Sequence, residues 1–161
     1  MIRIGTVILV VGVIATMAGA LYAYTLYQTN FIVVSAGEPV QVGPVQYVVL
    51  FDGTHMGDED TKPEHTFVKI KIEAENTSDE NTIMSGGQFY LQDEKEKNHI
   101  AIYGEFSTTD LRRVTLEPGK AQSMTTQFDV PFDEDSQYNV VIRPTKEQTT
   151  ADTAKICITN C

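Results

Sequence analysis

The two cysteines carry the most specific chemistry of the chain. Cys157 and Cys161 stand in CITNC and are the only cysteines among 161 residues. Outside the cytoplasm two thiols tend to oxidise. An extended strand would separate the two Cα atoms by about 13 Å, too far for a bridge, so the chain must turn back between them. The spacing predicts a short loop closed by a Cys157–Cys161 disulfide.

The same thiolates could instead bind copper, a soft metal that prefers sulfur ligands. The Cys-x-x-x-Cys spacing resembles the binuclear copper site in the second subunits of oxidases, in which a β-domain also follows membrane helices. Those sites continue with His and Met, whereas here the sequence stops at Cys161. Additional ligands would have to fold back from His55, His65, His99, Met56, Met84 or Met124.

An acidic segment between Asp52 and Glu64 is the second candidate metal site. Asp58, Glu59 and Asp60 are consecutive there, and carboxylate oxygens are the ligands that Ca²⁺ prefers. The EF-hand order with its central glycine is missing. A solvated surface loop is the alternative interpretation.

Motifs for catalysis are missing from the sequence: it holds no nucleophile elbow, phosphate loop or zinc-binding helix. We therefore expect no catalytic residues, no cofactor and no enzymatic activity. Asn76-Thr77-Ser78 matches the N-glycosylation acceptor pattern. The same three residues also favour turns.

A hydrophobic segment precedes all of these residues. Ile4 to Leu26 reads IGTVILVVGVIATMAGALYAYTL without a charge. A helix of this length is roughly 35 Å long, enough to cross the hydrocarbon core of a bilayer. Arg3 lies before the segment, and tyrosines gather at its far end, as in an interfacial belt. We predict one transmembrane helix with a cytoplasmic N-terminus and an extracytoplasmic C-terminal domain.

Small residues in this segment are spaced to share one face of the helix. They are Gly5, Gly12, Thr16, Gly19 and Ala23. Such a stripe lets another transmembrane helix approach closely, although glycine and alanine are also common in such helices. A cleaved secretory signal is an alternative, because Ala18-Gly19-Ala20 has the form that signal peptidase reads. Arg3-Ile4-Gly5 also resembles an archaeal pilin leader, without the glutamate often found after it.

The remainder of the chain reads as one all-β domain. In Thr66–Glu75, TFVKIKIEAE, apolar and charged residues alternate, which predicts a strand with one buried and one wet face. About eight or nine short strands at this spacing favour a sandwich. The other expected strands are Pro39–Val42, Val45–Phe51, Gln88–Gln92, His99–Tyr103, Val114–Leu116, Gln122–Val130, Tyr138–Arg143 and Lys155–Thr159. We predict three parts: residues 1–27 with the anchor, a short tether over 28–38, and a β-sandwich over 39–161.

Three features of this domain resemble a known family. They are Asn76 at the end of a strand, the Pro118-Gly119 turn, and the strand end Phe128-Asp129-Val130-Pro131. Together they resemble the telokin-like, immunoglobulin-like extracellular domains of unknown function on bacterial and archaeal surface proteins. The resemblance covers about residues 40–142 and implies an immunoglobulin-like β-sandwich; it brings no catalytic residues.

The net charge of the chain argues against nucleic acid as a partner. Acidic side chains number 22 against 12 basic ones, for a formal net charge of −10, which repels the phosphate backbone of nucleic acid. The expected partners are the lipid bilayer and other membrane-protein subunits. We expect a non-enzymatic accessory or interaction subunit on the outer face of a membrane complex. An extracytoplasmic copper or calcium module and a pilus or surface-filament subunit are the alternatives.

Overall fold

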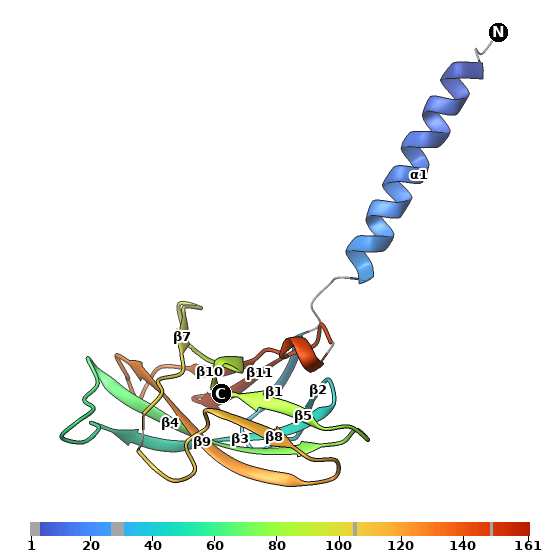
Figure 1. The fold of residues 1–161 in the computed structure, drawn as a ribbon. Coiled ribbons are helices and arrows are strands. Elements are labelled where there is room, and N and C mark those ends of the chain that lie inside the picture. The colour runs from blue at the N-terminus through green and yellow to red at the C-terminus, as the bar shows by residue number, and fades with distance from the viewer. Residues whose placement is uncertain (1–3, 27–30, 105, 149) are drawn as a thin grey trace.

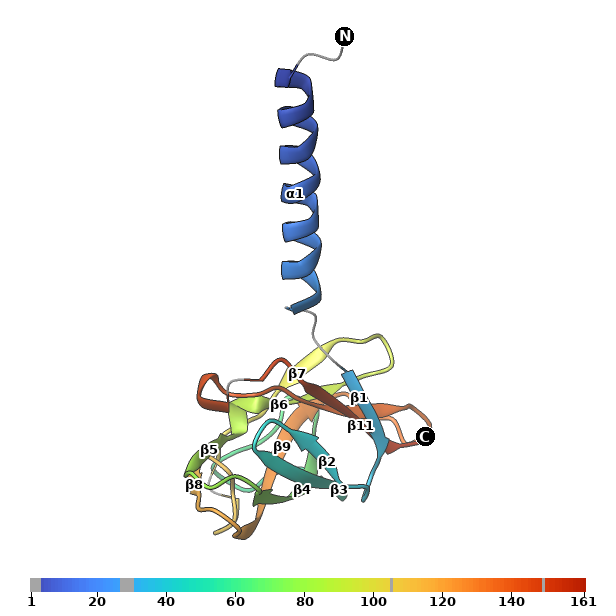
Figure 2. The same cartoon turned by 90° about the vertical axis from the view of Figure 1, so that its right-hand side faces the viewer.

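One helix and eleven strands make up most of the chain in the computed structural model, which describes residues 4–26, 31–104, 106–148 and 150–161. In Figures 1 and 2 the strands form a compact body from which the helix projects. The elements are α1 (Ile4–Leu26), β1 (Phe31–Ser35), β2 (Val40–Val42), β3 (Val45–His55), β4 (Thr66–Asn76), β5 (Thr82–Ser85), η1 (Gly86–Gln88), β6 (Phe89–Gln92), β7 (Asn98–Ile100), β8 (Arg113–Leu116), β9 (Ala121–Val130), β10 (Tyr138–Ile142), η2 (Lys146–Gln148) and β11 (Thr153–Thr159).

Helix α1 spans the segment predicted to be helical and leaves its apolar side chains exposed. The exposed fraction is 66% for Leu9, 62% for Met17 and 64% for Leu21. Among the residues that the structure describes, no helix has both the length and the hydropathy needed to cross a membrane. The predicted crossing therefore stays a prediction. Residues 1–3 and residues 27–30, which include the start of the predicted tether, lie outside the described residues.

The strands confirm the predicted all-β sandwich. One sheet has the order β1-β11-β10-β6-β7 and the other β2-β3-β4-β9, and β5 and β8 form a separate pair. We name the first sheet A and the second sheet B. Strand β4 alternates as predicted: Val68, Ile70 and Ile72 are fully buried, because successive side chains of a strand point to opposite faces.

The core lies between the two sheets. Tyr47 and Val49 of β3 meet Phe89 and Leu91 of β6 there, and all four side chains are fully buried. The rings of Tyr47 and Phe89 pack edge to face with centroids 5.9 Å apart, an arrangement that aromatic quadrupoles favour.

The structure contains two strands that the sequence patterns did not predict, and one of them lies in the segment predicted to be a tether. Phe31–Ser35, placed in the tether over 28–38, forms β1 and pairs in parallel with β11 from Phe31↔Thr153 to Ser35↔Cys157. Its β-branched residues suit a strand, and Ile32 and Val34 pack against the core. Thr82–Ser85 forms β5 against β8.

Strand boundaries also shift. The predicted strand His99–Tyr103 is wrong after Ile100, because β7 ends there. The chain then crosses toward sheet B, where Ile102 forms an isolated bridge with Gln127 of β9. Strand β3 runs on to His55, four residues beyond the predicted end, through an irregularity between Phe51 and Thr54.

Candidate functional site

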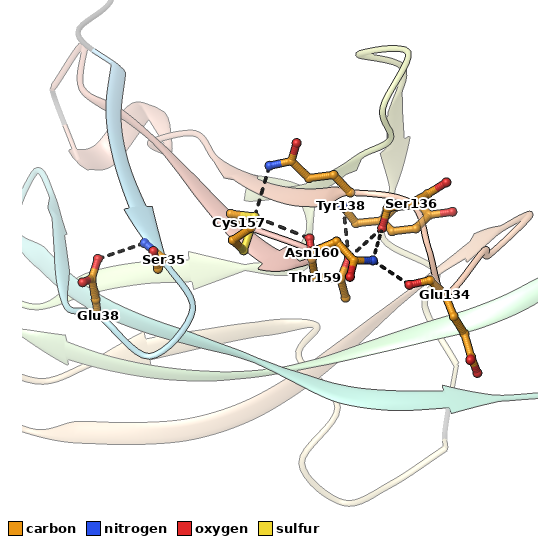
Figure 3. The surroundings of a disulfide bond; sticks show 10 residues. Ser35, Glu38, Glu134, Ser136, Tyr138, Cys157, Thr159 and Asn160 are labelled. Atoms are coloured by element: carbon orange, nitrogen blue, oxygen red, sulfur yellow. Dashed lines mark hydrogen bonds between the residues drawn. A yellow bond between two sulfur atoms is a disulfide. The ribbon is translucent and has the colours of Figure 1, made fainter.

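The two cysteines meet at the end of β11. They form a disulfide with Cα atoms 5.8 Å apart, and the chain turns back at Asn160, whose φ is +49°. The side-chain amide of Asn160 donates to the carbonyl oxygens of Glu134 and Ser136, as Figure 3 shows. Both sulfurs are bonded to each other, so in this state neither is a free thiolate for a soft metal.

In the acidic loop after β3, one carboxylate orders the backbone of the loop. Asp58 accepts hydrogen bonds from the backbone N–H of Asp60 at 3.0 Å and of Thr61 at 2.7 Å. Within the described ranges, no group of three or more His, Cys, Asp or Glu side chains is placed to hold a metal ion. The loop therefore does not bring Asp58, Glu59 and Asp60 together as a ligand set.

Asn76 corrects the glycosylation prediction. Its side chain is fully buried, and its amide nitrogen donates to the carbonyl oxygens of Glu80 at 2.7 Å and Leu116 at 2.9 Å. A glycan on that nitrogen would break at least one of these bonds and would have to lie inside the domain. In the folded protein Asn76 ties β4 to β8 and is not a surface acceptor.

No other part of the described structure covers the glycines of the small-residue stripe on α1. A Cβ atom built at Gly5, Gly12 or Gly19 would meet no other atom within 4 Å. Thr16 donates its hydroxyl to the carbonyl oxygen of Gly12 at 2.7 Å, which keeps the side chain folded back on the helix. The spacing places these residues and Ala23 along one face, free for a second helix to approach.

A polar pocket that the sequence did not predict lies at the end of the β3–β4 hairpin. Its volume is about 330 Å³, and its walls include the Lys69–Asp52 ion pair, with nitrogen and oxygen 3.0 Å apart. The rings of His55, Phe67 and Phe106 form a cluster: the His55 centroid is 5.2 Å from that of Phe67 and 5.4 Å from that of Phe106, and the two phenylalanine centroids are 5.1 Å apart. The register pairs His55 with Phe67, but no local pattern brings Phe106 to them.

The tautomer of His55 follows from its neighbours. The backbone N–H of Gly57 donates to Nδ1 at 3.1 Å, and an N–H can only donate, so Nδ1 carries no proton. Nε2 then bears the proton and points it at Oε1 of Gln127, 3.4 Å away. Both ring nitrogens therefore serve to fix the hairpin end.

Two carboxylates order loops around the sandwich. Burial alone would raise the pKa of Asp110, but hydrogen bonds from Ser107, from the backbone N–H of Phe106 and from Thr125 outweigh it and hold that pKa below its ordinary value. Burial would likewise raise the pKa of Asp93. Hydrogen bonds from the His99 side chain and from the backbone N–H groups of Lys97 and Lys95 outweigh this effect and lower that pKa below its ordinary value. Both groups favour the charged form in the folded protein.

A buried amide pair joins three parts of the domain. Gln88 donates to the side-chain oxygen of Gln148 at 2.9 Å and to the carbonyl oxygen of Arg143 at 3.0 Å. Gln148 in turn donates to the hydroxyl of Tyr47 at 3.2 Å. Burial raises the pKa of Tyr47, against the lowering effect of the bond from Gln148, so the hydroxyl stays neutral. These polar groups are structural links between sheet B and η1 and η2.

Comparison with known proteins places the chain in a family. Residues 34–151 match the family model "Domain of unknown function (DUF4352)". The chain belongs to the DUF4352 family. No curated protein matches it in sequence. The match begins within β1, ends before β11 and lies entirely within the β-domain. It does not confirm the telokin-like label of the resemblance.

Solved structures share the fold of this DUF4352 domain. The yjhA protein of Bacillus subtilis is similar with a TM-score of 0.62 and 18% identity, over 77% of this chain and 98% of that one. MPT63, a secreted protein of Mycobacterium tuberculosis, has a TM-score of 0.59 and 9% identity, over 82% of this chain and 99% of that one. At these identities the likeness concerns the fold alone.

Proposed function

We propose that this DUF4352 protein is a membrane-anchored, non-enzymatic accessory subunit, in which α1 docks in a membrane assembly and the β-sandwich stands on its outer face. One observation carries the proposal: a helix with exposed apolar side chains projects from a domain that already has a closed core. Exposed apolar surface of this extent requires lipid or protein to cover it.

The composition of the whole helical segment supports the anchor. All 23 residues from Ile4 to Leu26 are uncharged, and about 20 predominantly apolar residues are enough to span a bilayer. The exposed apolar side chains include Val10 and Val13, which lie on different faces from Gly12 and Gly19. Lipid covers such a surface all round, whereas the small-residue stripe offers a closer approach to a protein helix.

Two observations support an extracytoplasmic domain. The disulfide between Cys157 and Cys161 is typical of an oxidising compartment. MPT63, one of the proteins that share the fold, is a secreted protein. With the domain outside and α1 crossing the membrane once, the N-terminal end of α1 lies on the cytoplasmic side.

The immunoglobulin-like character of the sandwich is part of the proposal. Tyr138, at the start of β10, donates its hydroxyl to the carbonyl oxygen of Pro131 at 3.1 Å and accepts from the N–H of Asp133 at 3.1 Å. A tyrosine at a strand start that bonds back to upstream backbone is a feature of immunoglobulin-type sandwiches. Such domains commonly present surfaces to other proteins.

The test is gentle detergent extraction from native membranes followed by native mass spectrometry. The proposal expects the chain to travel with other subunits at fixed stoichiometry. Two matched variants identify the docking face: Ala23→Leu adds bulk on the stripe, and Ala18→Leu adds the same bulk on another face of α1. Because close helix packing depends on small residues, Ala23→Leu should release the chain from the complex and Ala18→Leu should not.

A free monomer from native membranes would contradict the accessory role. Equal effects of the two variants would show that the stripe does not form the contact. An N-terminus processed near Gly5 would instead favour a surface-filament subunit, and a stoichiometric metal ion in the purified protein would favour a metal-binding module.

A further inference from the structure

The outer face of sheet A carries an apolar row that the core does not use. The register aligns Val33, Lys155, Val141, Tyr90 and Ile100 across β1, β11, β10, β6 and β7. These residues alternate with the core residues of the same strands, such as Ile156, Val140 and Leu91, so they point away from sheet B. On the two edge strands Val33 is 68% exposed and Ile100 67% exposed, whereas Val141 in the middle of the row is only 4% exposed.

The charge of this face differs from that of the rest of the molecule. The five strands of sheet A, all within the described residues, contain no Asp or Glu. Sheet B carries Asp52, Glu73, Glu75 and Asp129 on its strands. In a chain with a net charge of −10, the strands of sheet A are thus free of acids, and acids close to them, Asp93, Glu94 and Glu96, lie in the β6–β7 turn.

Two cations stand on the same face beside an aromatic ring. Lys155 is in the apolar row, and Arg143, directly after β10, lies over the ring of Tyr90 at 4.7 Å from its centroid. Both cations and Phe31 line a hollow of about 350 Å³, with Glu96 from the β6–β7 turn as its acid. Exposed apolar and aromatic residues with Lys and Arg are the residue types found at membrane interfaces.

The outer face of sheet A lies near the end of α1, which favours the membrane as its partner. Phe31, 65% exposed, begins β1 only a few residues after Leu26, so it lies within about 18 Å of the helix end. Figures 1 and 2 both show β1, β7 and β11 on the side of the sandwich nearer α1, with β3, β4 and β9 on the far side. A bilayer that holds α1 would lie next to sheet A.

We propose that the outer face of sheet A rests on the headgroup layer of the membrane that holds α1. Phe31, Val33 and Ile100 enter the interface, and Arg143 and Lys155 pair with lipid phosphates. This inference rests on the proposed anchor and adds a second contact, which fixes the orientation of the sandwich and leaves sheet B facing away from the membrane. Partners of the domain would then bind at sheet B or at the loops.

Tryptophan substitution tests the contact directly, because the chain contains no tryptophan. The full-length variants Phe31→Trp, Ile100→Trp and the control Ser123→Trp, on β9 of sheet B, are reconstituted in phosphatidylcholine–phosphatidylglycerol vesicles containing brominated lipid. Bromine quenches only fluorophores at the membrane. We expect quenching of the tryptophans at positions 31 and 100, and none at position 123.

A charge reversal tests the electrostatic part. Lys155→Glu and its control Lys71→Glu, on β4 of sheet B, change the net charge equally. Each positive charge lost at an anionic surface lowers the ratio of docked to free domain about fivefold. Lys155→Glu in the Phe31→Trp background should therefore reduce quenching and shift the tryptophan emission toward that in water, whereas Lys71→Glu should change neither.

The outcomes separate this contact from the anchor. Retention of the chain in vesicles after alkaline carbonate extraction, without quenching at positions 31 and 100, would overturn the docked face while leaving the anchor intact. Loss of the chain from the vesicles would overturn both proposals. Equal quenching at all three positions, or a cross-linked dimer through sheet A, would also overturn it, because the face would then not be selective for lipid.

Discussion

The side-chain nitrogen of Gln148 lies 3.2 Å from the hydroxyl oxygen of Tyr47, to which it donates, although the two residues are 101 positions apart in the chain. Both side chains are buried, Tyr47 completely. The bond connects β3 of sheet B with η2, next to the Gln88–Gln148 pair. This contact contributes to stability because it satisfies the buried hydroxyl oxygen of Tyr47; the same nitrogen of Gln148 also donates to the carbonyl oxygen of Ile83 at 3.4 Å.

Tyr47→Phe should lower the free energy of unfolding by about 1.5 kcal/mol, because it removes one partner from a buried donor and keeps the ring. Denaturant unfolding followed by circular dichroism measures the change. Tyr103→Phe, at a side chain that is 56% exposed, is the control and should change little. An unchanged midpoint for Tyr47→Phe would show that the bond Gln148 already donates to the carbonyl oxygen of Ile83 is enough to satisfy its nitrogen.

Gly43 and Gly53 both have positive φ, but only Gly43 lacks space for a side chain, so alanine variants at the two positions distinguish backbone strain from overpacking. Gly43 has φ +57°, and a Cβ there would lie 2.8 Å from Cγ2 of Thr150 and 3.1 Å from the carbonyl oxygen of Gln148. Gly53 has φ +92° with no atom within 4 Å of its Cβ. Gly43→Ala should therefore cost about 1–3 kcal/mol more than the strain alone, since the contact adds overpacking.

The measurement is again the unfolding midpoint, with Gly53→Ala as the matched control for the left-handed backbone. Both variants should lose stability, because alanine is strained at positive φ. A loss for Gly43→Ala no larger than that for Gly53→Ala would indicate that Thr150 moves aside at little cost.

Acid should destabilise the domain through Asp110. Its pKa is lowered in the folded state, so its contribution is present above the ordinary pKa of 3.8 and is lost as the pH falls through the folded value. Asp110→Asn should be less stable at neutral pH and should lose less stability on acidification. Unfolding midpoints measured from pH 7 down to about pH 3 test this.

The control for that series is Asp135→Asn, an exposed aspartate that makes the same change in net charge. It separates the effect of losing one negative charge from that of losing the hydrogen bonds to Asp110. Parallel curves for Asp110→Asn and the unmodified protein would show that the hydrogen bonds from Ser107, Phe106 and Thr125 do not favour the ionised form.

Sequence patterns revealed the parts of the fold that depend on local alternation and turns. The alternation in Thr66–Glu75 predicted β4, and Pro118-Gly119 marked the turn before β9, where Gly119 has φ +65°. Strand β1 was missed because its partner β11 lies at the other end of the chain. Short β5 was missed for a similar reason, since only its pairing with β8 makes it a strand.

Long-range contacts also limited the prediction of sites. Asn76-Thr77-Ser78 fits a surface acceptor in sequence, but only the fold shows that Leu116 and Glu80 bind the amide of Asn76. The sequence suggests His55 only as a possible copper ligand, because its contacts with Phe106 and Gln127 arise from the fold. The outer face of sheet A depends on five strands taken together, and no single segment of the sequence shows it.

The disulfide offers a final test of how the C-terminal end is held. Cys161→Ser should lower the free energy of unfolding by about 2 kcal/mol, because the bridge closes a very short loop and so restricts the unfolded chain only modestly. Cys157 lies on β11, which pairs with both β1 and β10, and we expect this pairing to hold β11 in place without the bridge. The variant should therefore fold, and its spectrum should match that of the unmodified protein.

A reducing agent provides the matched control for the substitution. It should lower the unfolding midpoint of the unmodified protein to that of Cys161→Ser and leave the variant unchanged. If Cys161→Ser instead failed to fold, Asn160 and its bonds to the carbonyl oxygens of Glu134 and Ser136 would depend on the bridge, and the disulfide would be required to hold the end of β11 against the loop before β10.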